Sequence, residues 1–216
     1  MYEKEKQSLI DCALELKRCR LITLCGGNVC VRLADGNIAR TPSGLDYEVM
    51  TADDICIVDS MGKRVEGHRR PTSDLDAILF IFQKMPGVNA TIHTHQPCAT
   101  ALGLIADVFP ACLVSQIDAL QGDVPVAPFT PSSDKGMGEL TVQYANGSNA
   151  VILRSHGVMA FGSSLQIALY AAVYLEEAAQ TYLTALATGR QVQPLSPEMV
   201  KAELGEPDSW ANYLQT

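Results

Sequence analysis

Apolar and polar positions along the chain follow two different periods. In residues 4–19, apolar side chains such as Leu9, Ala13 and Leu16 recur at intervals of three or four, which predicts an amphipathic helix. The runs VCVRL and IART flank the turn ADGN, whose Asp-Gly pair predicts a β-hairpin. DICIVDSMGKRVEG repeats that pattern, so neighbouring strands are expected to be antiparallel and the sheet is not all-parallel.

The remainder of the chain alternates longer helices with apolar strands. A helix after residue 71 has clear ends, because Thr72 or Ser73 can cap its start and Pro86-Gly87 stops it. The further expected elements are a strand at 89–95, a helix from Pro97, a strand near 124–129, a helix over 132–144, strands at 150–157 and 158–162, a helix over 164–187 and a last helix after Ser196. No repeat or linker interrupts this order. We therefore expect one three-layer α/β domain over residues 1–216.

Composition narrows the class of protein. The chain has 216 residues, of which 47% are hydrophobic and 19% charged, and its formal net charge is −8. An acidic chain without basic segments is not expected to bind nucleic acid or anionic membranes, and no apolar run approaches the roughly 20 residues of a membrane helix. The N-terminus lacks a signal-peptide core, and the 7 cysteines contain no C-x-x-C pair. These features indicate a cytoplasmic protein with reduced thiols.

Two histidines stand one residue apart in the apolar strand NATIHTH. Residues i and i+2 of a strand point to the same face, which places the Cβ atoms of His93 and His95 about 6–7 Å apart. A pair of this kind is either a hydrogen-bonded core pair or part of a metal site. His156 ends another apolar strand, whereas His68 lies in a charged turn. Three neutral imidazoles with an open fourth position favour a catalytic zinc site over a structural one.

Three loops offer groups that suit an anion. GGNV at 26–29 provides unhindered amides beside an Asn, and TPSG at 41–44 adds a hydroxyl and a glycine. PTSD at 71–74 puts two hydroxyls at a helix N-terminus, where free N–H groups and the helix dipole favour negative charge. Each loop alone is a common turn or cap, but together with a metal site they suggest a small phosphorylated substrate.

These stretches, in this order, resemble the class II aldolase/adducin family over about residues 5 to 190. The carrying motifs are GGNVCVR, TPSG, PTSD, HTH and LRSHGVMAFG. The resemblance implies a three-layer α/β/α fold with a mixed, mostly antiparallel sheet, a catalytic Zn²⁺ and usually a homotetramer with sites at subunit interfaces. It matches His93, His95 and His156 to the zinc ligands, and Gly27, Asn28, Ser43, Gly44, Thr72 and Ser73 to the phosphate pocket.

The resemblance leaves the reaction open within the family. The short interval between His95 and His156 is similar to that of the L-fuculose-1-phosphate aldolases, which release dihydroxyacetone phosphate and an aldehyde through an enediolate. Asp74, Asp118 and the tail residue Tyr213 look more like catalytic residues of the L-ribulose-5-phosphate 4-epimerases. We expect a zinc-dependent aldolase, with Asp74 moving the proton.

Other readings of the sequence stay possible at this point. A 4-epimerase or a decarboxylase of a 3-oxo sugar-acid phosphate would use the same enediolate. An adducin-like binding module would lack the metal histidines that this chain has. A jelly-roll metal dioxygenase also shows H-x-H, but the long expected helices argue against an all-β barrel.

Overall fold

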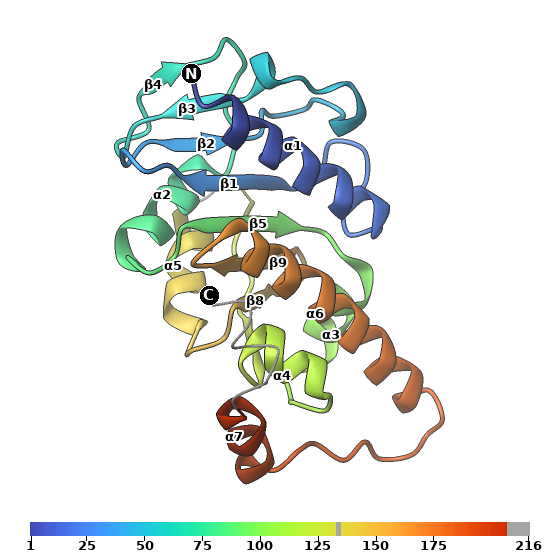
Figure 1. Cartoon of the computed structure of the whole chain (residues 1–216). Helices are drawn as coiled ribbons and strands as arrows, with labels where there is room; N and C mark the ends of the chain where they lie inside the picture. The colour runs from blue at the N-terminus through green and yellow to red at the C-terminus, as the bar shows by residue number, and fades with distance from the viewer. Residues whose placement is uncertain (133–134, 207–216) are drawn as a thin grey trace.

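A computed structural model describes residues 1–132 and 135–206 (Figure 1). The α-helices are α1 (Glu3–Arg18), α2 (Leu75–Lys84), α3 (Pro97–Ile105), α4 (Val114–Leu120), α5 (Lys135–Tyr144), α6 (Leu165–Leu186) and α7 (Pro197–Gly205). The strands are β1 (Asn28–Arg32), β2 (Ile38–Arg40), β3 (Cys56–Val58), β4 (Arg64–Glu66), β5 (Ala90–Thr94), β6 (Val108–Phe109), β7 (Val124–Ala127), β8 (Ala150–Leu153) and β9 (Gly157–Gly162). Two short 3₁₀ helices, η1 (Tyr47–Val49) and η2 (Ala52–Asp54), lie between β2 and β3.

The strands form one nine-stranded sheet in the order β4-β3-β2-β1-β5-β9-β8-β7-β6. All neighbours are antiparallel except β7 and β8, which are parallel. The prediction of a mixed, mostly antiparallel sheet is therefore confirmed. At the centre of the sheet, β5 pairs with β1 on one side and β9 on the other, so that His93 lies opposite Asn28 and Met159.

Side chains alternate between two helical layers along the central strands. Ala90 and Ile92 of β5 pack in the core beneath α1, α3, α4 and α6, whereas Met159 and Phe161 of β9 pack in the core beneath α2 and α5. Figure 1 shows α1 and α6 in front of the sheet and α2 and α5 behind it. Because side chains alternate between the two faces of a strand, His93 and Asn28 point to the face covered by α2. The start of that helix therefore lies over both residues.

Three local features differ from the expectation. The strand β6 and the helix α4 were not predicted, because both are short, with 2 and 7 residues. The expected side-chain cap of α2 by Thr72 or Ser73 is wrong: Asp74 occupies the N-cap position and no side chain caps the helix. These polar groups are instead engaged with one another and with Asn28.

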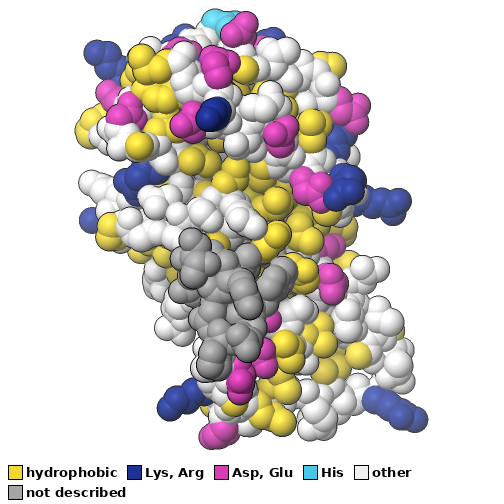
Figure 2. Space-filling model, in the orientation of Figure 1, with side chains coloured by type: hydrophobic (Ala, Val, Ile, Leu, Met, Phe, Trp, Pro, Cys, Tyr) yellow, Lys and Arg dark blue, Asp and Glu magenta, His cyan; other side chains and the backbone are white. Residues whose placement is uncertain are grey.

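The surface agrees with the charge pattern of the sequence. On the face shown in Figure 2, Lys and Arg side chains of the described residues are scattered among acidic ones and form no continuous basic patch. Within residues 1–132 and 135–206, no helix is both long and apolar enough to cross a membrane.

Candidate functional site

Strand pairing brings the three histidines together at one end of the sheet. His93 belongs to β5, and His95 follows directly after the end of that strand. His156 lies in the tight turn between β8 and β9, where its N–H donates to the carbonyl of Leu153. Because β9 runs antiparallel beside β5, with Val158 opposite Thr94, this turn is held next to the end of β5.

The three imidazoles present nitrogen atoms to one small volume. The Nε2 atoms of His93 and His95 are 3.1 Å apart, and one nitrogen from each ring lies within 4.8 Å of the other two. The rings of His93 and His156 meet edge to face with their centroids 4.8 Å apart. Such an arrangement suits one ion that takes a ligand from each ring.

Hydrogen bonding of the rings also fits a bound metal. His93 is buried, and its Nδ1–H donates to the Val158 carbonyl at 2.9 Å, which leaves the Nε2 lone pair directed into the cluster. The Nδ1 atom of His156 is buried and has no hydrogen-bond partner among the described residues. A buried nitrogen without a partner lowers the stability of the fold, and a cation bound by the three rings would provide a partner for their nitrogen lone pairs.

Burial keeps the imidazoles neutral. It lowers the pKa of His93 to about 4, against the opposing pull of the Asp74 carboxylate and with a further lowering by the two other rings. The pKa values of His95 and His156 are also lowered, again mainly by burial and partly offset by Asp74. A metal needs the unprotonated form of each ring, so these shifts favour coordination at neutral pH.

Two glycines permit the close packing of strands around the cluster. A Cβ on Gly157 would lie 2.2 Å from the Thr94 carbonyl oxygen and 3.0 Å from Cδ2 of His95. Gly27 has a φ of +77°, and a Cβ there would lie 2.3 Å from the carbonyl oxygen of His93. A side chain at either position would push against the backbone that carries the histidines.

Asp74 faces the cluster from the start of α2. Its side chain is buried, and Oδ2 accepts a hydrogen bond from Nδ2 of Asn28 at 2.8 Å. Its Oδ1 accepts from Oγ of Ser73 at 3.2 Å. Cys30 Sγ lies 3.7 Å from Oδ1 of Asn28 and donates to it, which turns the Asn28 amide group toward Asp74. The carboxylate is thus oriented from two sides.

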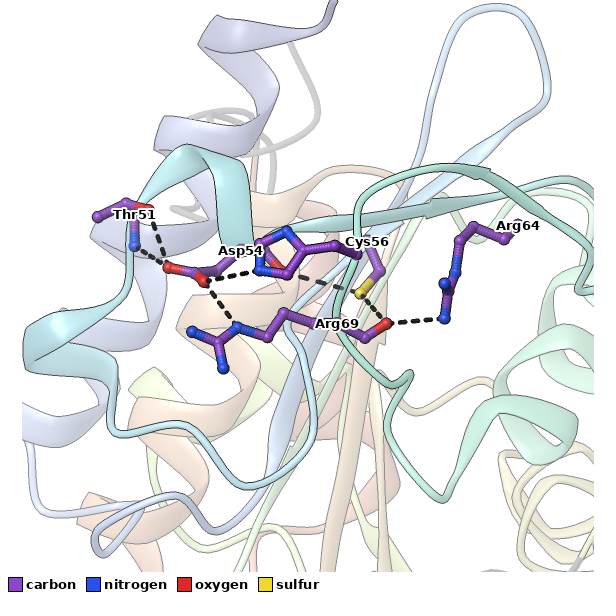
Figure 3. Close-up of polar contacts among 6 residues, drawn as sticks. Thr51, Asp54, Cys56, Arg64 and Arg69 are labelled. Atoms are coloured by element: carbon purple, nitrogen blue, oxygen red, sulfur yellow. Dashed lines mark hydrogen bonds and ion pairs between the residues drawn. The ribbon is translucent and has the colours of Figure 1, made fainter.

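The anion-binding loops are held side by side. Pro42 and Pro71 form an isolated β-bridge, and the N–H of Ser43 donates to the Arg70 carbonyl at 3.1 Å. Upstream, the Asp54 carboxylate accepts from Arg69 at 2.7 Å, as Figure 3 shows. The backbone before the hydroxyls of PTSD is therefore fixed against the loop TPSG.

The α2 N-terminus opens toward this region without a side-chain cap, so its first N–H groups are left to other acceptors. Around it lies a pocket of about 220 Å³, which combines the histidine cluster with the anion loops. Its lining is Cys25, Gly26, Gly27, Ser43, Gly44, Thr72, Ser73, Asp74, His93, His95, Ser132 and His156.

Most of these residues are the ones that the motifs predict, and Asn28 lies directly behind them. Cys25, Gly26 and Ser132 were missed. A signal for Ser132 was present, because TPSS at 130–133 is similar to TPSG.

Asp118, a further sequence candidate, lies away from this pocket. The described lining residues do not include Asp118, which lies on α4 and lines a separate hollow with Gly87, Gly162 and Ser163 at the opposite end of β9. Tyr213 lies outside the described residues. The catalytic roles of both stay predictions.

Residues 7–183 match the family described as "Class II Aldolase and Adducin N-terminal domain". The chain belongs to the class II aldolase and adducin family. Members of the class II aldolase group are metal-dependent, and the chain is accordingly an enzyme of the metal-dependent aldehyde-lyase class.

The chain is similar to relatives that have two different activities, an aldolase and a 4-epimerase. The L-fuculose phosphate aldolase of Escherichia coli is 32% identical over 201 residues, which are 93% of each chain. An L-ribulose-5-phosphate 4-epimerase of Salmonella typhi is 31% identical over 193 residues, covering 82% of this chain and 83% of the relative. A solved L-fuculose 1-phosphate aldolase superposes with a TM-score of 0.87 at 28% identity, covering 98% of this chain and 96% of that one.

Proposed function

We propose that the protein cleaves a ketose phosphate of the L-fuculose 1-phosphate kind to dihydroxyacetone phosphate and an aldehyde. The observation that carries this proposal is one pocket that joins three convergent imidazoles, the buried carboxylate of Asp74 and two hydroxyl-bearing loops at an uncapped helix start. The 32% identity to an L-fuculose phosphate aldolase supports the same reaction.

His93, His95 and His156 are proposed to hold a Zn²⁺ ion through one nitrogen each. Zinc bound in this way supplies Lewis acidity, which polarises a carbonyl and favours negative charge on its oxygen. The hydrogen bond from His93 to Val158 fixes one ring, and the neutral state of all three rings makes their nitrogens available. The nitrogen ligands and the open side of the pocket favour a catalytic over a closed structural site.

Asp74 is the proposed proton carrier. In the cleavage, the C4 hydroxyl loses its proton, the C3–C4 bond breaks with its electron pair moving to C3, and protonation of the resulting enediolate at C3 yields dihydroxyacetone phosphate. Asp74 lines the pocket together with the histidines and is buried, so its carboxylate can exchange a proton with C3. Asn28 orients this carboxylate through the 2.8 Å hydrogen bond.

The three loops GGNV, TPSG and PTSD are proposed to bind the phosphate group. The pocket at the N-terminus of α2 is lined by groups that can bind an anion. They are the backbone N–H groups of Gly27 and Gly44 and the hydroxyls of Ser43, Thr72 and Ser73. Such groups anchor the substrate in both the ground state and the transition state, so they position it without taking part in bond breaking. The expected homotetramer and cytoplasmic location remain part of this proposal.

A 4-epimerase is the second candidate, favoured by the 31% identity to an L-ribulose-5-phosphate 4-epimerase. Epimerisation would use the same bond cleavage, followed by rotation of the aldehyde and re-addition. The deciding experiment incubates the protein with L-fuculose 1-phosphate, L-ribulose 5-phosphate and 3-oxo sugar-acid phosphates, and measures released aldehyde, the 4-epimer and CO₂. The proposal expects aldehyde and dihydroxyacetone phosphate, and formation of the epimer or CO₂ alone would contradict it.

A further inference from the structure

One cation lies buried behind the candidate phosphate pocket. Arg40 ends β2 and is 0% exposed. Its place in the strand, two residues after Ile38, puts it on the sheet face beneath α2. Its Nε, Nη1 and Nη2 atoms have no hydrogen-bond partner among the residues that the structure describes.

An arginine in this state is unusual, because the guanidinium normally stays protonated and offers five donors. Burial lowers the pKa of Arg40, but an ordinary value above 12 leaves the group charged at neutral pH. A buried charge without hydrogen bonds opposes folding unless an opposite charge stabilises it. Arg40 therefore needs an anion nearby.

The residues beside Arg40 provide little negative charge. Cys30 on β1 and Cys56 on β3 lie opposite it in the sheet. Burial raises the pKa of Cys30 to about 12 and also raises that of Cys56, so both thiols stay neutral. Of the carboxylates that the structure describes, Asp74 is the one whose charge acts on Arg40.

Asp74 itself creates a difficulty for a phosphate ligand. A phosphate held by Ser43, Thr72 and Ser73 would lie in the same small pocket as the Asp74 carboxylate. Asp74 and a phosphate group would together carry about three negative charges. A Zn²⁺ ion held by the three neutral histidines would offset two of them, and the remaining repulsion is poorly screened in a partly buried site. Arg69, near the loop, does not relieve this repulsion, because its guanidinium is paired with Asp54 at 2.7 Å (Figure 3).

We propose that Arg40 is a positioning residue. It supplies positive charge to the phosphate pocket from the buried layer between the sheet and α2. Its guanidinium offsets the Asp74 carboxylate and thereby allows a phosphate group to bind beside it, without touching the reacting carbons. The pocket groups that would contact the phosphate are neutral hydroxyls and amides, so the positive charge needed beyond that of the proposed Zn²⁺ comes from the buried layer behind them. This inference rests on the proposed function.

The test measures binding of inorganic phosphate to the purified, metal-loaded protein by calorimetry. The variants are Arg40→Met and Arg40→Leu, which remove the charge, and Arg40→Lys, which keeps it. Arg32→Met is the matched control, since it removes a half-buried guanidinium from the far end of β1, where Arg32 donates to the Phe82 carbonyl. The melting temperature of each variant is recorded, and KM and kcat are measured with the best substrate found for the wild type.

We expect Arg40→Met and Arg40→Leu to weaken phosphate binding about tenfold or more, because the zinc charge alone no longer balances the Asp74 carboxylate and the phosphate. Their KM should rise more than their kcat falls, and Arg40→Lys should restore most of the affinity. Their melting temperatures should be unchanged or higher, since replacing an unpaired buried charge by an apolar side chain is often neutral or stabilising. Arg32→Met should bind phosphate as the wild type does.

Several outcomes would overturn the inference. Wild-type affinity in both uncharged variants would show that Arg40 does not serve the phosphate, and unfolding of both would show a structural role. In either case an active wild type that binds phosphate leaves the proposed function standing. If the wild type itself does not bind phosphate, the proposed pocket fails and this inference fails with it.

Discussion

The Nδ1–H of His93 donates to the backbone carbonyl of Val158 at 2.9 Å, which links the candidate metal cluster to the neighbouring strand. Because a main-chain oxygen is the acceptor, the bond fixes the ring without depending on another side chain. His95 is more exposed than His93, although its ring is partly covered within the cluster, and that ring makes no hydrogen bond to the backbone of the described residues. The two histidines should therefore respond differently to substitution, although both contribute a nitrogen to the same cluster.

His95→Ala should lose the metal and the activity while keeping the fold, since an exposed side chain is removed. His93→Ala should also lose the metal, and in addition lower the free energy of unfolding by about 1–3 kcal/mol, because it leaves a buried carbonyl unpaired. Metal analysis and chemical denaturation measure both effects. Stoichiometric zinc in His95→Ala would remove that residue from the ligand set.

Gly157→Ala should damage the site through the backbone. The added Cβ would meet the Thr94 carbonyl at 2.2 Å and His95 Cδ2 at 3.0 Å, so β5 and β9 must move apart. We expect a loss of about 1–3 kcal/mol of stability, as for other overpacking substitutions, together with weaker metal binding. Gly87→Ala is the control, because nothing lies within 4 Å of the Cβ it would add. Equal stability of the two variants would show that the close approach at Gly157 is not needed.

Ser73→Ala should act mainly on substrate binding. Ser73 is exposed in the pocket and offers one hydroxyl at the start of α2. Losing one hydrogen bond of about 1 kcal/mol should raise KM about fivefold with little change in kcat. Steady-state kinetics of the wild type and the variant separate the two constants. A fall in kcat alone would assign Ser73 to the chemistry, through its 3.2 Å contact with Asp74.

Asp74→Asn should abolish exchange of the C3 proton of dihydroxyacetone phosphate with solvent while zinc content stays unchanged. The amide has the same shape as the carboxylate but does not accept a proton at neutral pH. Proton NMR in D₂O follows the exchange, and metal analysis of the same sample provides the control. Loss of zinc would instead make Asp74 a metal ligand, and unchanged exchange would exclude it as the base.

Much of the fold and the site was readable from the sequence, because local patterns report on local structure. The period-two spacing of His93 and His95 predicts a shared face, and the Asp-Gly turn predicts the hairpin of β1 and β2, which the structure contains. His156 was recognised as the end of a strand, although it lies in the turn after β8. Its approach to His93 depends on the pairing of β5 with β9, which is a non-local contact.

Other features depend on tertiary contacts that the sequence does not display. Thr72 and Ser73 have the residue types of helix caps, but the Thr72 hydroxyl accepts from Asn28 and from the N–H of Asp74, and the Ser73 hydroxyl donates to the Asp74 carboxylate. Arg40 has no sequence pattern that predicts its complete burial, which follows from the place of β2 between β1 and β3 on the sheet face that α2 covers. Asp118 could not be placed relative to the histidines, because α4 was not foreseen.

Metal-dependent cleavage at the histidine cluster is tested most directly by ³¹P NMR together with an assay for released aldehyde. Both are applied to wild-type protein with L-fuculose 1-phosphate before chelation, after chelation and after zinc is restored. Dihydroxyacetone phosphate should form together with an equal amount of aldehyde, stop forming when the metal is removed, and form again with about one zinc per chain. Turnover that persists in the metal-free protein, or a phosphorylated 4-epimer formed without aldehyde release, would contradict the account.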